Sequence, residues 1–309
     1  MNHIEFGDCR EIMDKWIVDG VKAQCCITSP PYFGLRDYGH AGQIGLEETV
    51  DDYVAAMVSV FKRVKDLLAD DGTLWLNLGD SYYNYRPGKG QSLVKQTVSN
   101  TNQDLPQACA RRGNKQAGLK EKDLIGIPWR VAFALQADGW YLRQDIIWHK
   151  PNPKPESMKD RCTKNHEYIF LLTKQPRYYF DNEAIKEPVK EDWGTRDRSD
   201  GKYHNEGSGL SPHSGLEKSY DMANKRSVWT VTTKPFKGAH FAVYPPELIE
   251  PCVLAGTKVG DIVLDPFMGS GTTAAVAQRL NRQYIGCELN TDYQVLQAER
   301  LKQPSLELI

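Results

Sequence analysis

Two short segments of the sequence carry side chains that could do chemistry. The first, Thr28-Ser-Pro-Pro-Tyr32, follows an apolar run that is predicted to be a buried strand, and open α/β sheets bind ligands beyond the carboxyl ends of their strands. The Ser29 hydroxyl and the Pro30 carbonyl together can accept both hydrogens of an exocyclic amino group. Tyr32 adds a flat face on which a base can stack. The alternative interpretation is a proline-rich turn without a ligand.

The second segment, Asp265-Pro-Phe-Met-Gly-Ser-Gly-Thr-Thr273, lies between a predicted strand and a predicted helix. Its glycines allow a sharp turn and the close approach of a ligand, but a plain strand-to-helix turn would also use them. Glu288 follows about 20 residues later, where an acidic side chain accepts hydrogen bonds from ribose hydroxyls. A third glycine, which would pack against a pyrophosphate, is absent. This favours a nucleoside cofactor without a pyrophosphate, namely S-adenosylmethionine.

Together the two segments resemble those of the DNA amino-methyltransferases, whose motif [D/N/S]PP[Y/F/W] is paired with a FxGxG cofactor loop. The first motif precedes the cofactor loop, as in the circularly permuted beta group of that family. Other segments that resemble the family are Gly7-Asp8-Cys9, Asn77–Ser81, Trp148–Pro151, Lys164–Leu172, Arg226–Trp229 and His240–Pro246. The resemblance covers most of the chain apart from 85–122 and 186–226.

The resemblance implies a single catalytic domain, residues 1–309, with an α/β Rossmann-like methyltransferase fold, a mostly parallel seven-stranded sheet and a circularly permuted motif order. It implies that the catalytic residues are Ser29, Pro30, Pro31 and Tyr32. The residues that it assigns to the cofactor S-adenosylmethionine are Asp8, Cys9, Thr28, Phe241, Asp265, Pro266, Phe267, Gly269, Ser270, Gly271, Thr272, Thr273, Glu288 and Leu289.

Within this set the resemblance gives Glu288 to the ribose hydroxyls, Asp8 to the adenine amino group and Asp265 to the methionine amino group. The methionine part is lined by Phe241, Phe267, Gly269 and Gly271. For two of these residues a structural role is an alternative to cofactor binding. Asp8 is also placed to cap a helix, and Phe241 is also suited to the hydrophobic core.

The expected reaction is methyl transfer to a base that has been flipped out of the DNA duplex. Hydrogen bonds to Ser29 and Pro30 draw both amino hydrogens to one side, so that the nitrogen lone pair points at the methyl group and positioning is the main contribution. Serine at the first motif position is the family's usual choice for cytosine N4, and adenine N6 is the alternative. A neutral hydroxyl also avoids the repulsion that a carboxylate would exert on O2 and N3 of cytosine.

Composition sets the limits of these interpretations. The chain has 309 residues, 40% of them hydrophobic, and a net charge of −1, which excludes a disordered or collagen-like protein. No apolar run is long enough to span a membrane, so we expect a cytoplasmic enzyme without a membrane partner. The seven cysteines form no CxxC pair and the histidines no HxxxH pair, so no metal site is expected.

Hydrophobic spacing predicts the elements that must position the two segments. Predicted strands cover 23–28, 73–78, 140–148, 167–173, 261–265 and 283–288. Predicted helices run from 50 to near Gly72 and over 123–138, 272–280 and 291–302. Alternation of this kind indicates a mostly parallel α/β sheet.

Two segments do not fit the alternation and are predicted to be insertions. Residues 85–122 are polar and carry a net charge of +6, whereas 186–226 are rich in Ser, Gly and balanced charge. Each is either mobile surface or a nucleic-acid contact, and 186–226 occupies the family's target-recognition position. The candidate DNA contacts are Arg111, Arg112, Lys115, Arg196, Arg198 and Lys202. Beside DNA, a second copy of the chain and a cognate restriction endonuclease are candidate partners.

Three other functions fit parts of the sequence less well than DNA methylation does. A protein glutamine methyltransferase uses a similar motif, but with Asn first and with the cofactor loop before it. A nucleotide-binding module without catalysis fits the same fold, but it would not need Ser29–Tyr32 together with Glu288. A metal enzyme lacks ligands at suitable spacing.

Overall fold

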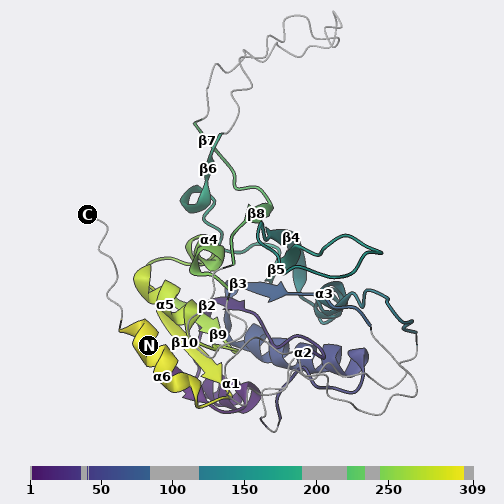
Figure 1. Cartoon of the computed structure of the whole chain (residues 1–309). Helices are drawn as coiled ribbons and strands as arrows, with labels where there is room; N and C mark the ends of the chain where they lie inside the picture. The colour runs from purple at the N-terminus through teal and green to yellow at the C-terminus, as the bar shows by residue number, and fades with distance from the viewer. Residues whose placement is uncertain are drawn as a thin grey trace, which may run out of the picture.

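The computed structural model describes residues 2–35, 40, 42–83, 118–189, 221–233 and 244–302. At its centre is an eight-stranded sheet (Figure 1). Across this sheet the strands are β1 (Asn2–Phe6), β10 (Gln283–Glu288), β9 (Ile262–Asp265), β2 (Ala23–Thr28), β3 (Leu68–Leu78), β5 (His166–Thr173), β4 (Tyr141–His149) and β8 (Val228–Thr230). A short 3-10 helix, η1 (Glu183–Ile185), precedes a small second sheet of β6 (Glu187–Pro188) and β7 (Met222–Ala223).

The sheet is mostly parallel, as predicted. The strands β1, β10, β9, β2 and β3 run parallel to one another, β5 runs antiparallel to β3 and β4, and β8 is parallel to β4. The predicted count of seven strands is corrected to eight. The additional strand β8 is three residues long, and it is held beside β4 by the buried Trp229, whose ring lies 6.4 Å from that of Trp75.

Helices cover both faces of the sheet (Figure 1). They are α1 (Cys9–Val18), α2 (Val50–Leu67), α3 (Ile127–Ala137), α4 (Pro246–Gly256), α5 (Thr272–Arg279) and α6 (Tyr293–Leu301). One hydrophobic cluster contains buried side chains of α1, α2 and α3, and the other contains those of α4 and α5 with Leu301 of α6 against it. The two clusters pack on opposite faces, so the ends of the strands are left for the site.

The end of α2 differs from its prediction. The Thr49 hydroxyl caps the helix by accepting from the Asp52 amide at 3.1 Å, but the helix ends at Leu67 and not near Gly72. Residues 69–72 lie in a bulge of the pairing of β2 with β3, because Ala23 pairs with Leu68 and Cys25 pairs with Thr73. Gly72 therefore lies inside the strand, where a Cβ would come within 2.9 Å of the Gln24 carbonyl.

Other predicted elements are present, and β2 and β10 have the predicted bounds. The helix predicted over 123–138 begins at Ile127, because the Asp80 carboxylate accepts from the amides of Gly126 and Ile127 and so fixes the helix start. The strand β1 and the helix α4 were not predicted. Prolines 246 and 251 hide the α4 pattern, although the first of them suits the start of a helix.

Parts of both predicted insertions lie outside the described residues. Of 85–122 the structure describes 118–122, and of 186–226 it describes 186–189 and 221–226. The assignment of 1–309 to a single catalytic domain with these insertions stays a prediction. Within the described residues, no helix has the length and apolar character that a membrane crossing needs.

Candidate active site

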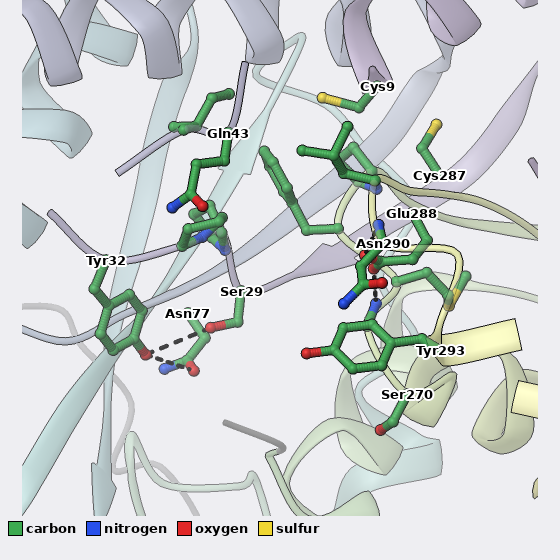
Figure 2. A pocket seen from close by; sticks show the side chains of 18 of the residues that line it. Cys9, Ser29, Tyr32, Gln43, Asn77, Ser270, Cys287, Glu288, Asn290 and Tyr293 are labelled. Atoms are coloured by element: carbon green, nitrogen blue, oxygen red, sulfur yellow. Dashed lines mark hydrogen bonds between the residues drawn. The ribbon is translucent and has the colours of Figure 1, made fainter. Parts of the chain in front are cut away.

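A cavity of about 480 Å³ opens at one edge of the central sheet. Its lining comes from the segments that follow the carboxyl ends of β1, β2, β9 and β10, and from the same edge of β3, β4 and β5. This is the position at which open α/β sheets bind their ligands. Figure 2 shows Ser29 between two groups of side chains, with Tyr32 and Asn77 on one side and Glu288 and Asn290 on the other.

The catalytic wall is the side of the cavity formed by Ser29–Tyr32 with Asn77 and Glu167. All four residues of the predicted catalytic motif line the cavity. The Tyr53 hydroxyl of α2 donates to the Pro31 carbonyl at 2.9 Å. The Tyr32 ring lies over Gly79, where a Cβ would come within 2.6 Å of a ring carbon. Backbone packing therefore sets the orientation of this ring.

A chain of hydrogen bonds runs along the catalytic wall. The Ser29 hydroxyl donates to the Tyr32 oxygen at 3.4 Å, and the Tyr32 hydroxyl donates to Glu167 Oε2 at 2.8 Å. Asn77 Oδ1 lies 3.3 Å from the same tyrosine oxygen (Figure 2). Burial, with the Glu167 carboxylate next, raises the pKa of Tyr32 well above its usual value. The phenol therefore keeps its proton at neutral pH.

The cofactor wall is the opposite side, formed by Pro266–Ser270 and Glu288–Asn290. Gly269 and Gly271 adopt φ of 54° and 83°, in the left-handed region that favours glycine. The Gly269 amide donates to Glu288 Oε2 at 2.7 Å, and the Asn290 amide donates to Oε1 at 2.8 Å. Burial raises the pKa of Glu288 to about 7, although these two amides act in the opposite direction.

Asp265 is buried and is not among the residues that line the cavity. Its carboxylate is 1% exposed and accepts from Thr28 Oγ1 at 2.6 Å and from Thr273 Oγ1 at 2.5 Å. The Phe267 amide and the Tyr244 hydroxyl also donate to it, at 3.0 and 3.1 Å. Burial raises the pKa of Asp265 despite these donors. With four donors in place, its carboxylate ties the two predicted segments together. Its role toward the methionine amino group stays a prediction.

The other predicted cofactor residues fall into three groups. Those that line the cavity are Asp8, Cys9, Pro266, Phe267, Gly269, Ser270, Thr272, Glu288 and Leu289. Those that lie behind its lining are Thr28, Asp265, Gly271 and Thr273. Phe241 lies outside the described residues, as do all the candidate DNA contacts, Arg111, Arg112, Lys115, Arg196, Arg198 and Lys202.

Asp8 caps helix α1 and also lines the cavity. As the N-cap of α1 it accepts from the Arg10 amide at 2.8 Å, and it forms an ion pair with the Arg10 guanidinium at 2.5 Å. The hydrogen bond to Arg10 lowers the pKa of Asp8. Because Asp8 also lines the cavity, its role toward the adenine amino group stays a prediction.

Comparison with known proteins identifies the fold and the family. The sequence model of the DNA methylase family matches residues 23–299, which include both walls. The chain belongs to the DNA methylase family. It is 47% identical over 295 residues to the type II methyltransferase M.SmaI of Serratia marcescens, and the match covers 96% of this chain and 89% of that protein.

Solved structures agree with this DNA methylase in fold. PvuII DNA methyltransferase (cytosine-N4-specific) gives a TM-score of 0.62 at 17% identity, over 99% of this chain and 88% of that one. The M1.HpyAVI–SAM complex gives 0.58 at 18% identity, over 98% of this chain and 100% of that one. This DNA methylase therefore has the Rossmann-like methyltransferase fold, and it is an S-adenosylmethionine-dependent DNA amino-methyltransferase related to type II modification enzymes.

Several cavity residues of this DNA methylase were not predicted individually. They are Asn77, Trp148, Lys150, Glu167, Tyr244, Asn290 and Tyr293. Lys150 lies 4.0 Å from the centre of the Trp148 ring and forms an ion pair with Glu167. The segments Trp148–Pro151 and Lys164–Leu172 were recognised as resembling the family. The sequence did not show that β5 runs antiparallel to β4 and so brings Glu167 beside the end of β4.

Proposed function

We propose that this enzyme methylates the N4 amino group of a cytosine flipped out of duplex DNA, with the N6 group of adenine as the alternative target. The observation that carries the proposal is that Ser29–Tyr32 and Glu288 line one cavity. A module that only bound a nucleotide would need the cofactor wall but not the amino-accepting group opposite it. Flipping is required because a stacked base cannot present its amino group to an enclosed cofactor.

The cofactor wall suits the nucleoside part of S-adenosylmethionine. Each Glu288 oxygen accepts one backbone amide and keeps a second lone pair for a ribose hydroxyl. Gly269 leaves the loop open, since its backbone lines the cavity without a side chain. When bound, the cofactor supplies an electrophilic methyl group attached to a sulfonium.

The catalytic wall suits an amino group that must be oriented rather than deprotonated first. The Ser29 Oγ and the Pro30 carbonyl would accept its two hydrogens, so that the nitrogen lone pair points across the cavity toward the cofactor wall. Tyr32 would stack on the flipped base and offset part of the cost of flipping. The new C–N bond forms as the C–S bond breaks, and the proton leaves the methylated nitrogen afterwards.

Cytosine is favoured over adenine because the first acceptor is a hydroxyl. Cytosine carries the acceptors N3 and O2 on the side of the ring next to its amino group, and a carboxylate near them would be repelled. Ser29 carries no charge. The PvuII structure is named as cytosine-N4-specific, but at 17% identity it supports the fold and not the choice of base.

Mass spectrometry of nucleosides tests the proposal directly. DNA of mixed sequence is incubated with the enzyme and S-adenosylmethionine, digested and analysed; we expect N4-methylcytosine. Ser29→Ala should lower the yield, whereas the matched control Ser227→Ala, which lies outside the cavity at the start of β8, should not. N6-methyladenine alone would select the alternative target. The proposal would be overturned if neither N4-methylcytosine nor N6-methyladenine formed on any duplex or single strand.

The DNA contacts are proposed from charge alone. We expect Arg111, Arg112 and Lys115 to contact phosphates, since 85–122 carries a net charge of +6. Neutralising all three should reduce the slope of log affinity against log salt concentration, because each phosphate contact contributes about −0.9. We expect Arg196, Arg198 and Lys202 to belong to the segment that sets sequence preference. An unchanged slope and an unchanged methylation site would contradict these assignments.

A second copy of the chain and a cognate restriction endonuclease stay candidate partners, and the cytoplasmic location stays a prediction. The relationship to M.SmaI places the protein among type II methyltransferases. Analytical ultracentrifugation with and without DNA would test the dimer. A pull-down from cells that contain the neighbouring genes would test the endonuclease.

A further inference from the structure

Ser29 must accept a hydrogen bond from the target amino group in the proposed reaction, yet a serine hydroxyl is also a donor. A serine that turned its hydrogen toward the substrate would oppose the hydrogens of the amino group. The hydroxyl therefore needs a partner that occupies its hydrogen. The structure provides that partner in Tyr32, whose oxygen lies 3.4 Å from Ser29 Oγ.

The far end of this chain is a carboxylate that can only accept. Glu167 Oε2 lies 2.8 Å from the Tyr32 oxygen, and Glu167 Oε1 forms an ion pair with Lys150. The Glu167 side chain is 17% exposed and that of Lys150 is 19% exposed, so few waters compete for these contacts. In this arrangement the carboxylate accepts from both Lys150 and the phenol.

Asn77 presents its acceptor to the same phenol. Its Nδ2 donates to the Tyr168 carbonyl at 3.0 Å and to Glu167 Oε2 at 3.3 Å. Because both of these partners accept, the amide nitrogen must face them, and Oδ1 is left facing Tyr32 at 3.3 Å. The asparagine is also buried, at 4% exposure. Its orientation is thereby fixed.

Tyr32 thus faces two acceptors and has one hydrogen to give. The hydrogen goes to Glu167, which is the nearer and the charged acceptor. The lone pairs of the phenol oxygen are then the groups that meet Ser29, so the serine hydrogen is directed to Tyr32. Every bond in the chain points the same way, toward the carboxylate.

We propose that Glu167 is a positioning residue that acts through Tyr32 and fixes Ser29 as a hydrogen-bond acceptor for the target amino group. The proposal deepens the proposed function and rests on it. Ser29 then offers lone pairs to the substrate as an Asp side chain would, but without a negative charge next to the base. The ion pair with Lys150 holds Glu167 in place for this task.

The test compares kcat, KM for DNA and cofactor affinity in three variants. In Glu167→Gln the amide can donate to Tyr32, which leaves Asn77 Oδ1 and Ser29 to compete for the phenol hydrogen. The Ser29 oxygen is then no longer fixed as an acceptor, so kcat should fall about 10-fold or more, with KM and cofactor affinity within about twofold of the wild type. Tyr32→Phe removes the chain but keeps the ring, and leaves the Ser29 hydrogen undirected, so kcat should fall less. In Tyr32→Phe/Glu167→Gln, the second substitution should change kcat by less than about twofold. The matched control is Glu11→Gln, an exposed carboxylate of α1.

The effect of Glu167→Gln on kcat in the wild-type and the Tyr32→Phe backgrounds shows whether Glu167 acts through Tyr32. If Glu167→Gln lowers kcat by the same factor in the Tyr32→Phe background as in the wild-type background, the carboxylate acts independently of the phenol and the proposal is overturned. It is equally overturned if Glu167→Gln turns over as fast as the wild type. Loss of cofactor affinity in Glu167→Gln would indicate misfolding, and the Tyr32→Phe variant, which keeps the ion pair, then carries the test. A wild-type enzyme that methylates no amino group would instead refute the proposed function.

Discussion

Gly269 and Glu288 on the cofactor wall are joined by a hydrogen bond from a backbone amide, whereas Ser29 and Tyr32 on the catalytic wall are joined by hydrogen bonds between side chains. On the first wall a positive φ and two amide hydrogen bonds set the geometry. On the second, a chain of hydroxyl, phenol and carboxylate does so. A Cβ added at Gly269 should therefore damage the cofactor wall, and a change in the hydrogen-bonding groups of Ser29 or Tyr32 should damage the catalytic wall. Each wall can be broken without the other.

The largest effect is expected from Gly269→Val. A β-branched residue at φ of 54° is strained, and movement of the loop costs the amide bond to Glu288, which together should weaken S-adenosylmethionine binding about 100-fold or more. Titration calorimetry measures the affinity. The matched control is Gly20→Val, with φ of 71° and nothing within 4 Å of its Cβ. It should lose stability but keep its affinity, and equal affinities in both variants would contradict the assignment.

Ser29→Ala should come next and should affect the other wall alone. It removes the acceptor of one amino hydrogen, and a preorganised polar contact of this kind contributes about 2–4 kcal/mol to the barrier. Single-turnover methyl transfer should slow accordingly, with cofactor affinity unchanged. Near-wild-type turnover in this variant would refute the orienting role of Ser29.

Tyr32→Ala should have a smaller effect that depends on the DNA. Loss of stacking on the flipped base costs about 1–3 kcal/mol. A target base in a mismatch is already unstacked in part, so the loss in kcat/KM should shrink on mismatched duplexes. Equal losses on matched and mismatched duplexes would show that Tyr32 does not stabilise the flipped base.

The smallest effect is a dependence of cofactor binding on pH. Glu288 has a pKa of about 7, so it is largely protonated at pH 6 and ionised at pH 8. Ribose hydroxyls donate best to the ionised form, so affinity should rise with pH through 7, by up to about 10-fold between pH 6 and 8. Glu288→Gln should bind more weakly with a flat profile. A wild-type affinity that is constant over this range would contradict the ribose assignment.

The raised pKa of Glu288 has the opposite consequence for the stability of the cofactor-free protein, which should decrease as the pH rises. A carboxyl whose pKa is raised by folding binds its proton more readily in the folded state, so the free energy of unfolding should fall as the pH rises from about 5 to above 7. Denaturant titrations at pH 5.5 and 7.5 measure this change. It should be smaller in Glu288→Gln.

The sequence alone predicted those parts of the site that are continuous in the chain. The SPPY segment and the glycine loop were found because each lies on one strand-to-helix connection. The sequence could not reveal the contacts of Glu167, because they depend on β5 entering the sheet antiparallel between β3 and β4. Nor could it reveal that the hydroxyls of Thr28, Thr273 and Tyr244 surround Asp265.

The fold was predictable to a similar degree. Apolar runs such as 23–28 and 283–288 are buried strands, and their bounds were predicted without error. The end of α2 was missed because the strand bulge near Gly72 depends on a partner strand. The start of α3 was missed because its cap, Asp80, comes from a distant loop. Local patterns fix the type of an element, and tertiary partners fix where it begins and ends.

Asp265 and Thr28 are 237 positions apart in sequence, and their hydrogen bond joins the two motifs. Among the described strands, β1 pairs with β10 alone, and the Tyr284 amide donates to the Asn2 side chain at a separation of 282 positions. Because a chain is synthesised from its N-terminus, the segment of Ser29 leaves the ribosome long before the segments of Gly269 and Glu288, which we propose to bind the cofactor. The lining of the cavity comes from both parts of the chain, so the cavity is completed only after β9 and β10 have emerged.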